Sequence, residues 1–122
     1  QMSWANAMDA SLVYYQRVGR FDEAARVAVN VAMAFPFEAN PRFVAGSVML
    51  KDGQIRRALP WLRSAAELES RNTKYLMALA QGYFQAGMFR ESAVVLERVL
   101  LLEPEHPTAP QYLERARAAA EG

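Results

Sequence analysis

Three glycines lie at one fixed spacing, and this spacing constrains the fold more than any other feature of the chain. Gly19, Gly53 and Gly87 follow one another at intervals of 34 residues. The positions around them keep the same interval, with a large apolar residue two places after each glycine and a small residue three places later. These two sets are Phe21, Ile55 and Phe89, and Ala24, Ala58 and Ser92. Self-similarity at such a period is typical of proteins built from stacked structural repeats.

Apolar periodicity predicts an α-helix on each side of these glycines. Before the first glycine, apolar residues recur every three or four places, which puts them on one face of a helix that ends near Gly19. They are Trp4, Met8, Leu12 and Tyr15. The same reasoning predicts six further helices, over about residues 22–36, 40–52, 56–69, 73–86, 90–103 and 108–119. No segment alternates apolar and polar residues for long, so we expect no β-sheet.

Short polar residues mark the expected starts of these helices, because their side chains satisfy free backbone N–H groups there. The predicted caps are Asp22, Asn40, Asn72 or Thr73, and Thr108. Pro60 is expected in the first turn of the helix over residues 56–69, where proline is tolerated.

Composition limits the kinds of protein that this chain can be. With 122 residues, 52% of them hydrophobic and 22% charged, it has enough apolar material for one domain and is too apolar to be disordered. Its longest charge-free stretch, residues 75–89, is shorter than the roughly 20 residues of a membrane span, so we expect no membrane insertion. A start at Gln1 indicates a segment of a longer protein. Cytoplasm and bacterial periplasm are both compatible with the sequence.

Residue types needed for catalysis or metal binding are scarce. The chain has no cysteine and one histidine, His106, which lies between Glu105 and Pro107 in a predicted loop. These residues cannot complete a metal site or a nucleophilic triad. We therefore expect no cofactor, no metal and no enzymatic activity in this chain.

The repeating positions resemble the tetratricopeptide repeat (TPR) family, whose 34-residue unit is a pair of antiparallel helices. The unit over residues 73–106 matches the family pattern most fully. Its matching residues are Leu76, Ala80, Tyr83, Gly87, Phe89, Ser92, Leu96, Val99 and Pro104. Two further units match over 5–38 and 39–72. The latter departs at Arg42, where the family has a large apolar residue, and at Ser70, where it has proline.

The resemblance implies an all-α fold, namely a right-handed α-solenoid of three TPR helix hairpins plus a C-terminal capping helix over about residues 108–120. The whole of 1–122 would form a single domain. A hairpin of this size cannot bury its apolar face alone, so each depends on its neighbours. The polar outer side that ends such a stack is assigned to Glu114, Arg115, Arg117 and Glu121.

In the family, the first helices of successive units line a concave groove, and the matching positions give the implied lining of this chain. They are Asn6, Asp9, Val13, Gln16, Arg17, Asn40, Phe43, Ser47, Leu50, Lys51, Lys74, Met77, Gln81, Phe84 and Gln85. Some family members hold a C-terminal carboxylate with a clamp of Lys, Asn and Arg. Because Asp9 and Val13 occupy two of the places that this clamp needs, we expect no recognition of chaperone tails.

The centre of the implied groove is apolar. Its apolar residues suit an amphipathic helix or an extended apolar segment of a protein or peptide partner. They are Phe43, Leu50, Met77 and Phe84. In the alternative interpretation, Phe43 packs within the stack in place of the large residue missing at Arg42.

The middle of the chain is its most basic part. Residues 41–75 contain seven basic and three acidic residues, although the net charge of the whole chain is only +1. Arg56 and Arg63 share one face of a predicted helix, and with Arg57 they form a candidate basic patch for an acidic protein or another polyanion. Ordinary solvated charge is the alternative interpretation. The low net charge argues against nucleic-acid binding.

These expectations indicate a noncatalytic scaffold for protein–protein interaction that binds a partner segment through its concave groove. The alternative is a structural spacer or self-associating array within a larger assembly, such as bacterial secretion or polysaccharide-export machinery.

Overall fold

The structure is a computed structural model that describes residues 12–122. Residues 12–17 are helical, and six longer helices follow. Their bounds are α2 Phe21–Ala34, α3 Ala39–Lys51, α4 Ile55–Leu68, α5 Thr73–Gln85, α6 Phe89–Leu102 and α7 Ala109–Glu121. Between residues 12 and 122 there is no strand, and no helix there is long and apolar enough to cross a membrane.

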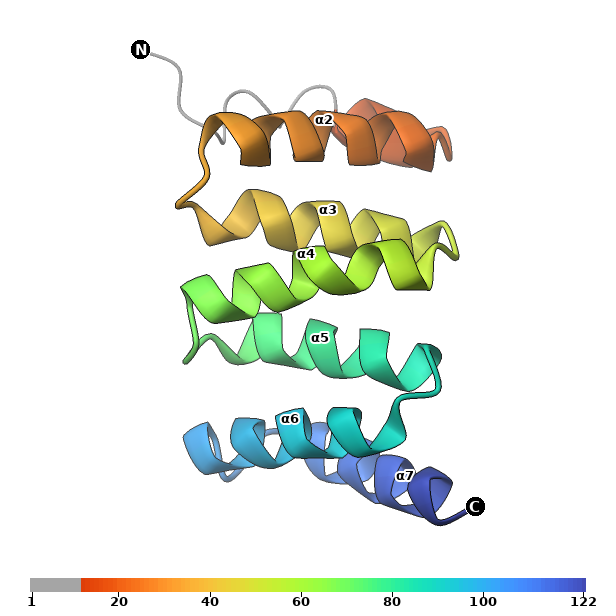
Figure 1. Cartoon of the computed structure of the whole chain (residues 1–122), viewed down its shortest axis with the longest axis vertical. Helices are drawn as coiled ribbons and strands as arrows, with labels where there is room; N and C mark the ends of the chain where they lie inside the picture. The colour runs from red at the N-terminus through yellow and green to blue at the C-terminus, as the bar shows by residue number, and fades with distance from the viewer. Residues whose placement is uncertain (1–11) are drawn as a thin grey trace.

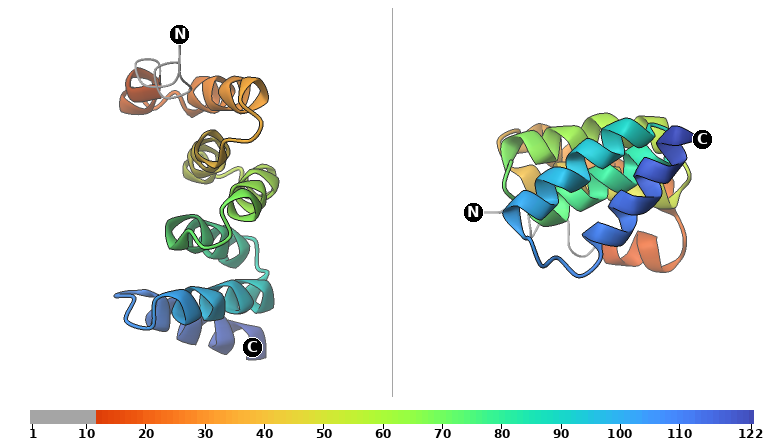
Figure 2. Two further views of the ribbon diagram at one scale, coloured as in Figure 1. Left: turned by 90° about the vertical axis from the view of Figure 1, so that its left-hand side faces the viewer. Right: turned by 90° about the horizontal axis from the view of Figure 1, so that it is seen from below.

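The helices are stacked in chain order. Each helix from α2 to α6 packs against the next one in the chain, and α3 also touches α5. Figure 1 shows the helices lying across the long axis of the molecule, with α2 and α7 at opposite ends. In the side view of Figure 2, α2 and α4 lie on one side of the stack and α3 and α5 on the other. Consecutive hairpins therefore lie side by side, and the predicted all-α solenoid is confirmed.

The core is formed where the helices of the two sides meet. Leu62 of α4 has none of its surface exposed. The small residues of the repeat are equally buried, with exposed fractions of 0% at Ala24, 0% at Ala58 and 1% at Ser92. The Ser92 hydroxyl donates a hydrogen bond of 2.8 Å to the carbonyl oxygen of Ala80 in α5. This bond satisfies a polar group whose burial would otherwise destabilise the fold.

The three glycines of the repeat end their helices with the same turn. Their φ angles are 75°, 78° and 78°, a left-handed conformation that residues with a Cβ adopt rarely. After α3, the N–H of Gly53 donates to the carbonyl oxygen of Leu50 at 3.0 Å. The N–H of Gln54 donates to the carbonyl oxygen of Met49 at 2.9 Å. Together these bonds form a Schellman motif, which satisfies carbonyl groups at the end of the helix.

Two of the predicted N-caps are wrong, because Asp22 and Asn40 lie inside their helices. α2 begins one residue before Asp22, and α3 begins one residue before Asn40. Only Val18, Gly19 and Arg20 separate the first two helices, so α2 starts too early for Asp22 to cap it. The side chain of Asn40 instead donates to the hydroxyl oxygen of Tyr75 in α5, at 3.4 Å.

The predicted cap of α5 is confirmed, whereas the predicted place of Pro60 is wrong. The side-chain oxygen of Asn72 accepts a hydrogen bond of 3.2 Å from the backbone N–H of Tyr75. Pro60 is the sixth residue of α4 and lies beyond its first turn, since α4 begins at Ile55 directly after a glycine turn. Proline has no N–H to donate to the carbonyl oxygen of Arg56, so α4 lacks one of its hydrogen bonds.

The last helix is capped by His106 and not by the side chain of Thr108. Thr108 precedes α7, but its side chain makes no capping hydrogen bond. The Nδ1 atom of His106 accepts hydrogen bonds from the backbone N–H groups of Thr108 and Ala109, at 3.2 and 3.1 Å. An accepting Nδ1 requires that the neutral ring carry its proton on Nε2. The histidine of the predicted loop therefore holds the start of α7.

Arg42 occupies the position where the family pattern has a large apolar residue. Its guanidinium lies 5.9 Å from the ring centroid of Trp61 in α4. It also donates to the hydroxyl oxygen of Ser64 at 2.8 Å and to the carbonyl oxygen of Pro36 at 3.0 Å. A cation within cation–π range of an aromatic ring, with a hydrogen bond to Ser64, thus links α3 to α4 at this position.

Candidate functional site

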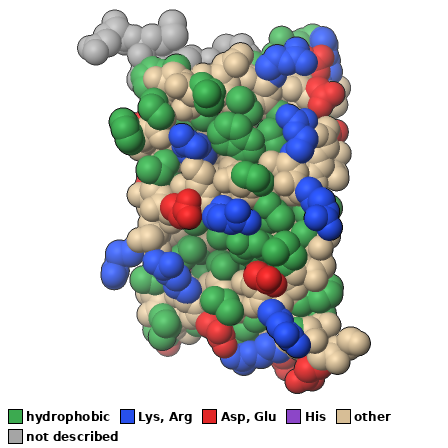
Figure 3. All heavy atoms as spheres, viewed as in Figure 1, with side chains coloured by type: hydrophobic (Ala, Val, Ile, Leu, Met, Phe, Trp, Pro, Cys, Tyr) green, Lys and Arg blue, Asp and Glu red, His purple; other side chains and the backbone are tan. Residues whose placement is uncertain are grey.

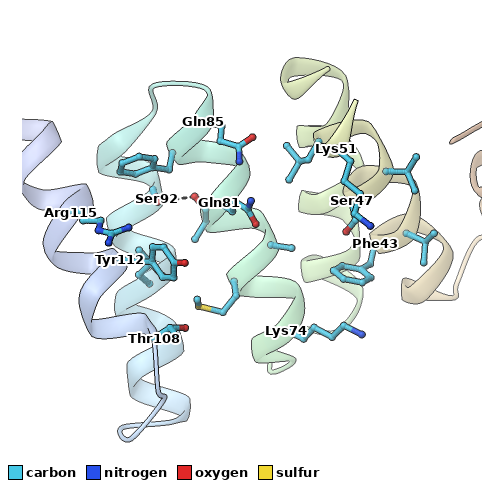
Figure 4. A pocket seen from close by; sticks show the side chains of 18 of the residues that line it. Phe43, Ser47, Lys51, Lys74, Gln81, Gln85, Ser92, Thr108, Tyr112 and Arg115 are labelled. Carbon is cyan, nitrogen blue, oxygen red and sulfur yellow. Dashed lines mark hydrogen bonds between the residues drawn. The ribbon is translucent and has the colours of Figure 1, made fainter. Parts of the chain in front are cut away.

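A groove of about 1070 Å³ lies on the side of the stack that α3, α5 and α7 form. These three helices supply most of its lining, and Gln16 adds to it from the helix before α2. Figure 4 shows side chains of α3, α5 and α7 that point into the same space. The first helices of successive hairpins therefore make one continuous surface.

Most residues that the resemblance assigned to a groove lie in this lining. They are Gln16, Phe43, Ser47, Leu50, Lys51, Lys74, Met77, Gln81, Phe84 and Gln85. Val13 and Arg17 do not line the groove, because it reaches the helix before α2 only at Gln16. Asn40 of α3 is also absent from the lining, and its side chain donates to the hydroxyl oxygen of Tyr75. The side chain of Val13 is 56% exposed. Asn6 and Asp9 lie outside the described residues.

Phe43 both lines the groove and packs within the stack, so its two interpretations are not exclusive. Its ring lies 4.8 Å from that of Tyr75, centroid to centroid, with the ring planes tilted by 33°. It packs with this ring against Ala39 and Ala65. On the groove side, the ammonium nitrogen of Lys74 lies 4.9 Å from the Phe43 centroid, within the range of a cation–π interaction.

The rest of the apolar floor comes from α3 and α5. Leu50 and Met77 are partly buried and pack against the core. Phe84 has 37% of its surface exposed, and its ring meets that of Phe89 edge to face at 5.0 Å. Of the two phenylalanines of the floor, Phe84 is therefore the more exposed.

The C-terminal helix contributes to the groove, which the sequence analysis missed. Thr108, Tyr112 and Arg115 line it from the side of α7 (Figure 4). The assignment of Arg115 to the polar outer side is therefore wrong. The 34-residue spacing itself could have found these residues, since they follow Lys74, Ala78 and Gln81 by one period. α7 thus repeats the role of α3 and α5.

The charge of the lining has a single sign. Among residues 12–122, its charged side chains are those of Lys51, Lys74 and Arg115, and neither aspartate nor glutamate belongs to it. The ammonium nitrogen of Lys51 donates to the side-chain oxygen of Gln16 at 3.1 Å. The guanidinium of Arg115 lies 5.5 Å from the ring centroid of Tyr112. None of the three neighbouring side chains, Gln16, Phe43 and Tyr112, is a carboxylate, so none of them neutralises the positive charge.

The candidate basic patch lies on α4, which faces the viewer in Figure 3. Basic side chains there are interspersed with acidic and hydrophobic ones. Arg56, Arg57 and Arg63 are all exposed. Arg57 donates to the side-chain oxygen of Gln54, and Arg63 donates to the hydroxyl oxygen of Tyr83 at 3.2 Å. Two of the three guanidinium groups therefore already have partners within the chain.

One carboxyl group outside the groove has a shifted pKa. The guanidinium of Arg20 donates two hydrogen bonds, of 3.0 and 2.7 Å, to the carboxylate of Glu23 and so lowers the pKa of that group. Both side chains are close to the start of α2 and away from the groove lining. Within residues 12–122, no cluster of His, Asp and Glu side chains is suited to a metal ion.

The fold and the groove define a protein of stacked helix hairpins with a groove along the first helices. Comparisons with models of known families and with curated proteins find no match. Comparison with solved structures finds many. The first TPR domain of Spaghetti (RPAP3), solved with the HSP90 peptide SRMEEVD, has a TM-score of 0.86 and 22% identity over 97% of this chain and 94% of its own.

Two further solved structures show the same likeness. The TPR domain of Arabidopsis OM64 has a TM-score of 0.81 and 16% identity, over 93% of this chain and 94% of its own. YrrB, described as a TPR protein with an unusual peptide-binding site, has a TM-score of 0.84 and 23% identity, over 96% of this chain and 60% of its own. The chain has the tetratricopeptide repeat fold, and the resemblance seen in its sequence is confirmed at that level.

Proposed function

We propose that this chain is a noncatalytic interaction scaffold that binds a segment of a partner protein in the groove. The observation that carries the proposal is the groove itself, with an apolar floor and a polar rim on three successive first helices. Its volume is at the upper end of ordinary ligand pockets, which is enough for several residues of an extended peptide. The repeat units over 5–38, 39–72 and 73–106 and the helix over 108–120 would act as one domain.

The side chains of the rim suit a peptide. Ser47, Gln81 and Gln85 carry hydroxyl and amide groups that can both donate to and accept from a peptide backbone. Phe84 offers an exposed aromatic face to an apolar side chain. A solved neighbour of the same fold carries a bound peptide, which supports this use of the groove without defining the ligand.

A spacer or self-associating array is the second candidate function. Three large apolar side chains are exposed and so available to a neighbouring molecule, namely Met33 at 70%, Phe37 at 88% and Leu101 at 83%. Met33 and Leu101 are two periods apart and lie at the C-terminal ends of α2 and α6. Sedimentation over a wide concentration range tests this function. Association that Leu101→Lys abolishes would support it.

A selection of displayed peptides tests the groove directly. Peptides enriched on the wild-type chain should no longer bind the variant Gln81→Glu/Phe84→Asp, which places two carboxylates on the floor and rim. Both residues are exposed, so the helical content should stay unchanged by circular dichroism. The matched control is Arg56→Asp on α4, which should bind normally. Loss of binding in the control alone, or enrichment of no peptide, would rule the groove out as the site.

A further inference from the structure

We infer that the groove selects an acidic segment, and that it holds this segment through several side-chain carboxylates and not through a terminal carboxylate. The inference rests on the proposed function, since it specifies the chemistry of the segment that binds there. It is drawn from three observations on the cationic side chains of the groove: their lack of counter-charges, their contacts with uncharged neighbours, and their separate positions around the groove.

The first observation is that the cations of the groove lack counter-charges. Lys51, Lys74 and Arg115 are the charged side chains of the lining. The ion pairs found within residues 12–122 involve other side chains, so none of these three is paired with a carboxylate in the described part of the chain. Three unpaired cations beside an apolar surface produce a positive potential that attracts anions and repels cations. A segment rich in Lys or Arg is therefore a poor occupant.

The second observation is that uncharged neighbours hold each cation at the groove. Lys74 lies over the ring of Phe43, and Arg115 lies over the ring of Tyr112. Lys51 donates to the amide oxygen of Gln16. Such contacts restrict long, exposed side chains without neutralising them, so a bound carboxylate meets a cation that is already positioned.

The third observation is that the cations do not converge. In Figure 4, Lys51 and Lys74 lie at opposite edges of the groove, and Arg115 lies across it on α7. A terminal carboxylate is one small group, and a site for it needs several donors around one point. Cations at three separate corners instead suit carboxylates distributed along a chain, with apolar side chains between them on the floor near Phe84.

Synthetic peptides provide the test. We consider three peptides of about a dozen residues, acetylated and amidated, with Leu or Phe at every third position and Glu, Gln or Lys elsewhere. Binding of the labelled peptides is measured by fluorescence anisotropy at about 50 mM and about 500 mM salt. At low salt we expect the Glu peptide to bind at least roughly tenfold more tightly than the Gln peptide, and the Lys peptide to bind most weakly. The difference between the Glu and Gln peptides should shrink at high salt.

Charge reversal in the chain assigns the effect to the groove. Lys74→Glu and Arg115→Glu should each weaken binding of the Glu peptide. Binding of the Gln peptide should stay nearly unchanged. Arg56→Glu, which changes the net charge equally but lies on α4, should have little effect. Replacing the amide of the Glu peptide by a free carboxylate should change its affinity less than twofold, because side-chain carboxylates carry the binding.

Several outcomes would overturn the inference. Equal binding of the Glu and Gln peptides would refute the selection of an acidic segment. If Phe84→Asp then abolished binding of both peptides, the groove would still be the peptide site. Binding that requires the free carboxylate would indicate a clamp at the peptide terminus. Binding of a single-stranded oligonucleotide as tight as that of the Glu peptide would indicate a general polyanion site. Absence of measurable binding by the Glu peptide would also refute the inference, and the peptide selection then decides the proposed function separately.

Discussion

Gly46 and Gly82 lie inside helices, and the packing around them leaves different amounts of space for an added Cβ atom. A Cβ at Gly46 would come within 2.6 Å of Cγ of Leu62 and 3.2 Å of the carbonyl oxygen of Ala58. At Gly82 the nearest atoms, both leucine methyl groups, would be 3.1 Å away. We expect Gly46→Ala to lower the free energy of unfolding by about 1–2 kcal/mol, because overpacking outweighs the better helix propensity of alanine.

Denaturant unfolding measures both variants. Gly82→Ala is the matched control, and its change should be smaller, because leucine methyl groups can move by a few tenths of an ångström. A Gly46→Ala protein as stable as the wild type would mean that α3 and α4 are further apart than the structure shows.

His106 is a second residue whose role depends on its surroundings. Its Nδ1 atom accepts two backbone N–H groups at the start of α7, so His106→Ala leaves both without this partner. We expect a loss of about 0.5–2 kcal/mol in the free energy of unfolding, as for other helix caps. Thr108→Ala is the control and should cost less, since the Thr108 side chain makes no capping bond. Thermal melts followed by circular dichroism compare the two, and equal losses would contradict the assignment.

The roles of individual residues at the helix starts were the hardest feature of this structure to predict. The polar character of Asp22, Asn40 and Thr108 predicted caps, but the actual starts depend on the length of each preceding turn. The role of His106 was missed because histidine is not among the residue types that commonly cap helices, although its bonds to Thr108 and Ala109 are local. Asn72 was predictable because its side chain bonds within its own first turn.

At the scale of elements, α4 is weakened by its own proline. Pro60 is exposed and lies in the interior of the helix, where its ring prevents one backbone hydrogen bond. We expect Pro60→Ala to raise the free energy of unfolding by roughly 1–3 kcal/mol. Urea unfolding measures the gain. Glu67→Ala, at another exposed position of α4, should change stability by less than about 0.5 kcal/mol. A destabilised Pro60→Ala protein would show that the helix needs the proline.

The elements themselves were largely predictable. Apolar residues at helical spacing predicted every helix between residues 12 and 122 to within a few residues, because burial of one face determines that pattern. One role of a helix was not predicted, namely the contribution of α7 to the groove. It was assigned to capping alone, although its spacing of 34 residues from α5 also places Thr108, Tyr112 and Arg115 in the groove.

At the scale of the whole molecule, stability should be shared among the hairpins. α3 and α4 pack on each other, and each also packs on a helix of a neighbouring hairpin. Tyr75 of α5, for example, packs against Ala39 and Ala65 of the preceding hairpin. A peptide of residues 39–72 should therefore be mostly unfolded in isolation, while the whole chain unfolds in one cooperative transition. Circular dichroism of the two samples checks this. A stably helical peptide would contradict the dependence on neighbours.

The groove was predictable as a surface and not in its details. Positions on the first helices follow from the repeat register, and most of them line the groove. The support of Lys74 by Phe43 and of Arg115 by Tyr112 could not be predicted, because it depends on side-chain conformations on adjacent helices. The sign of the charge in the groove emerges only when α3, α5 and α7 are brought together.

The glycine turns have a consequence for how such a chain can change over evolution. The bonds around Gly53 are made within its own hairpin, and nothing lies within 4 Å of where its Cβ would be; the same space is open at Gly19 and Gly87. Duplication or deletion of a complete 34-residue unit would therefore preserve every turn and would require a fit only between the outer surfaces of adjoining hairpins. Recombination between repeats could thus lengthen or shorten the groove in whole steps, whereas an insertion of one or two residues within a helix would disturb the register of all that follows.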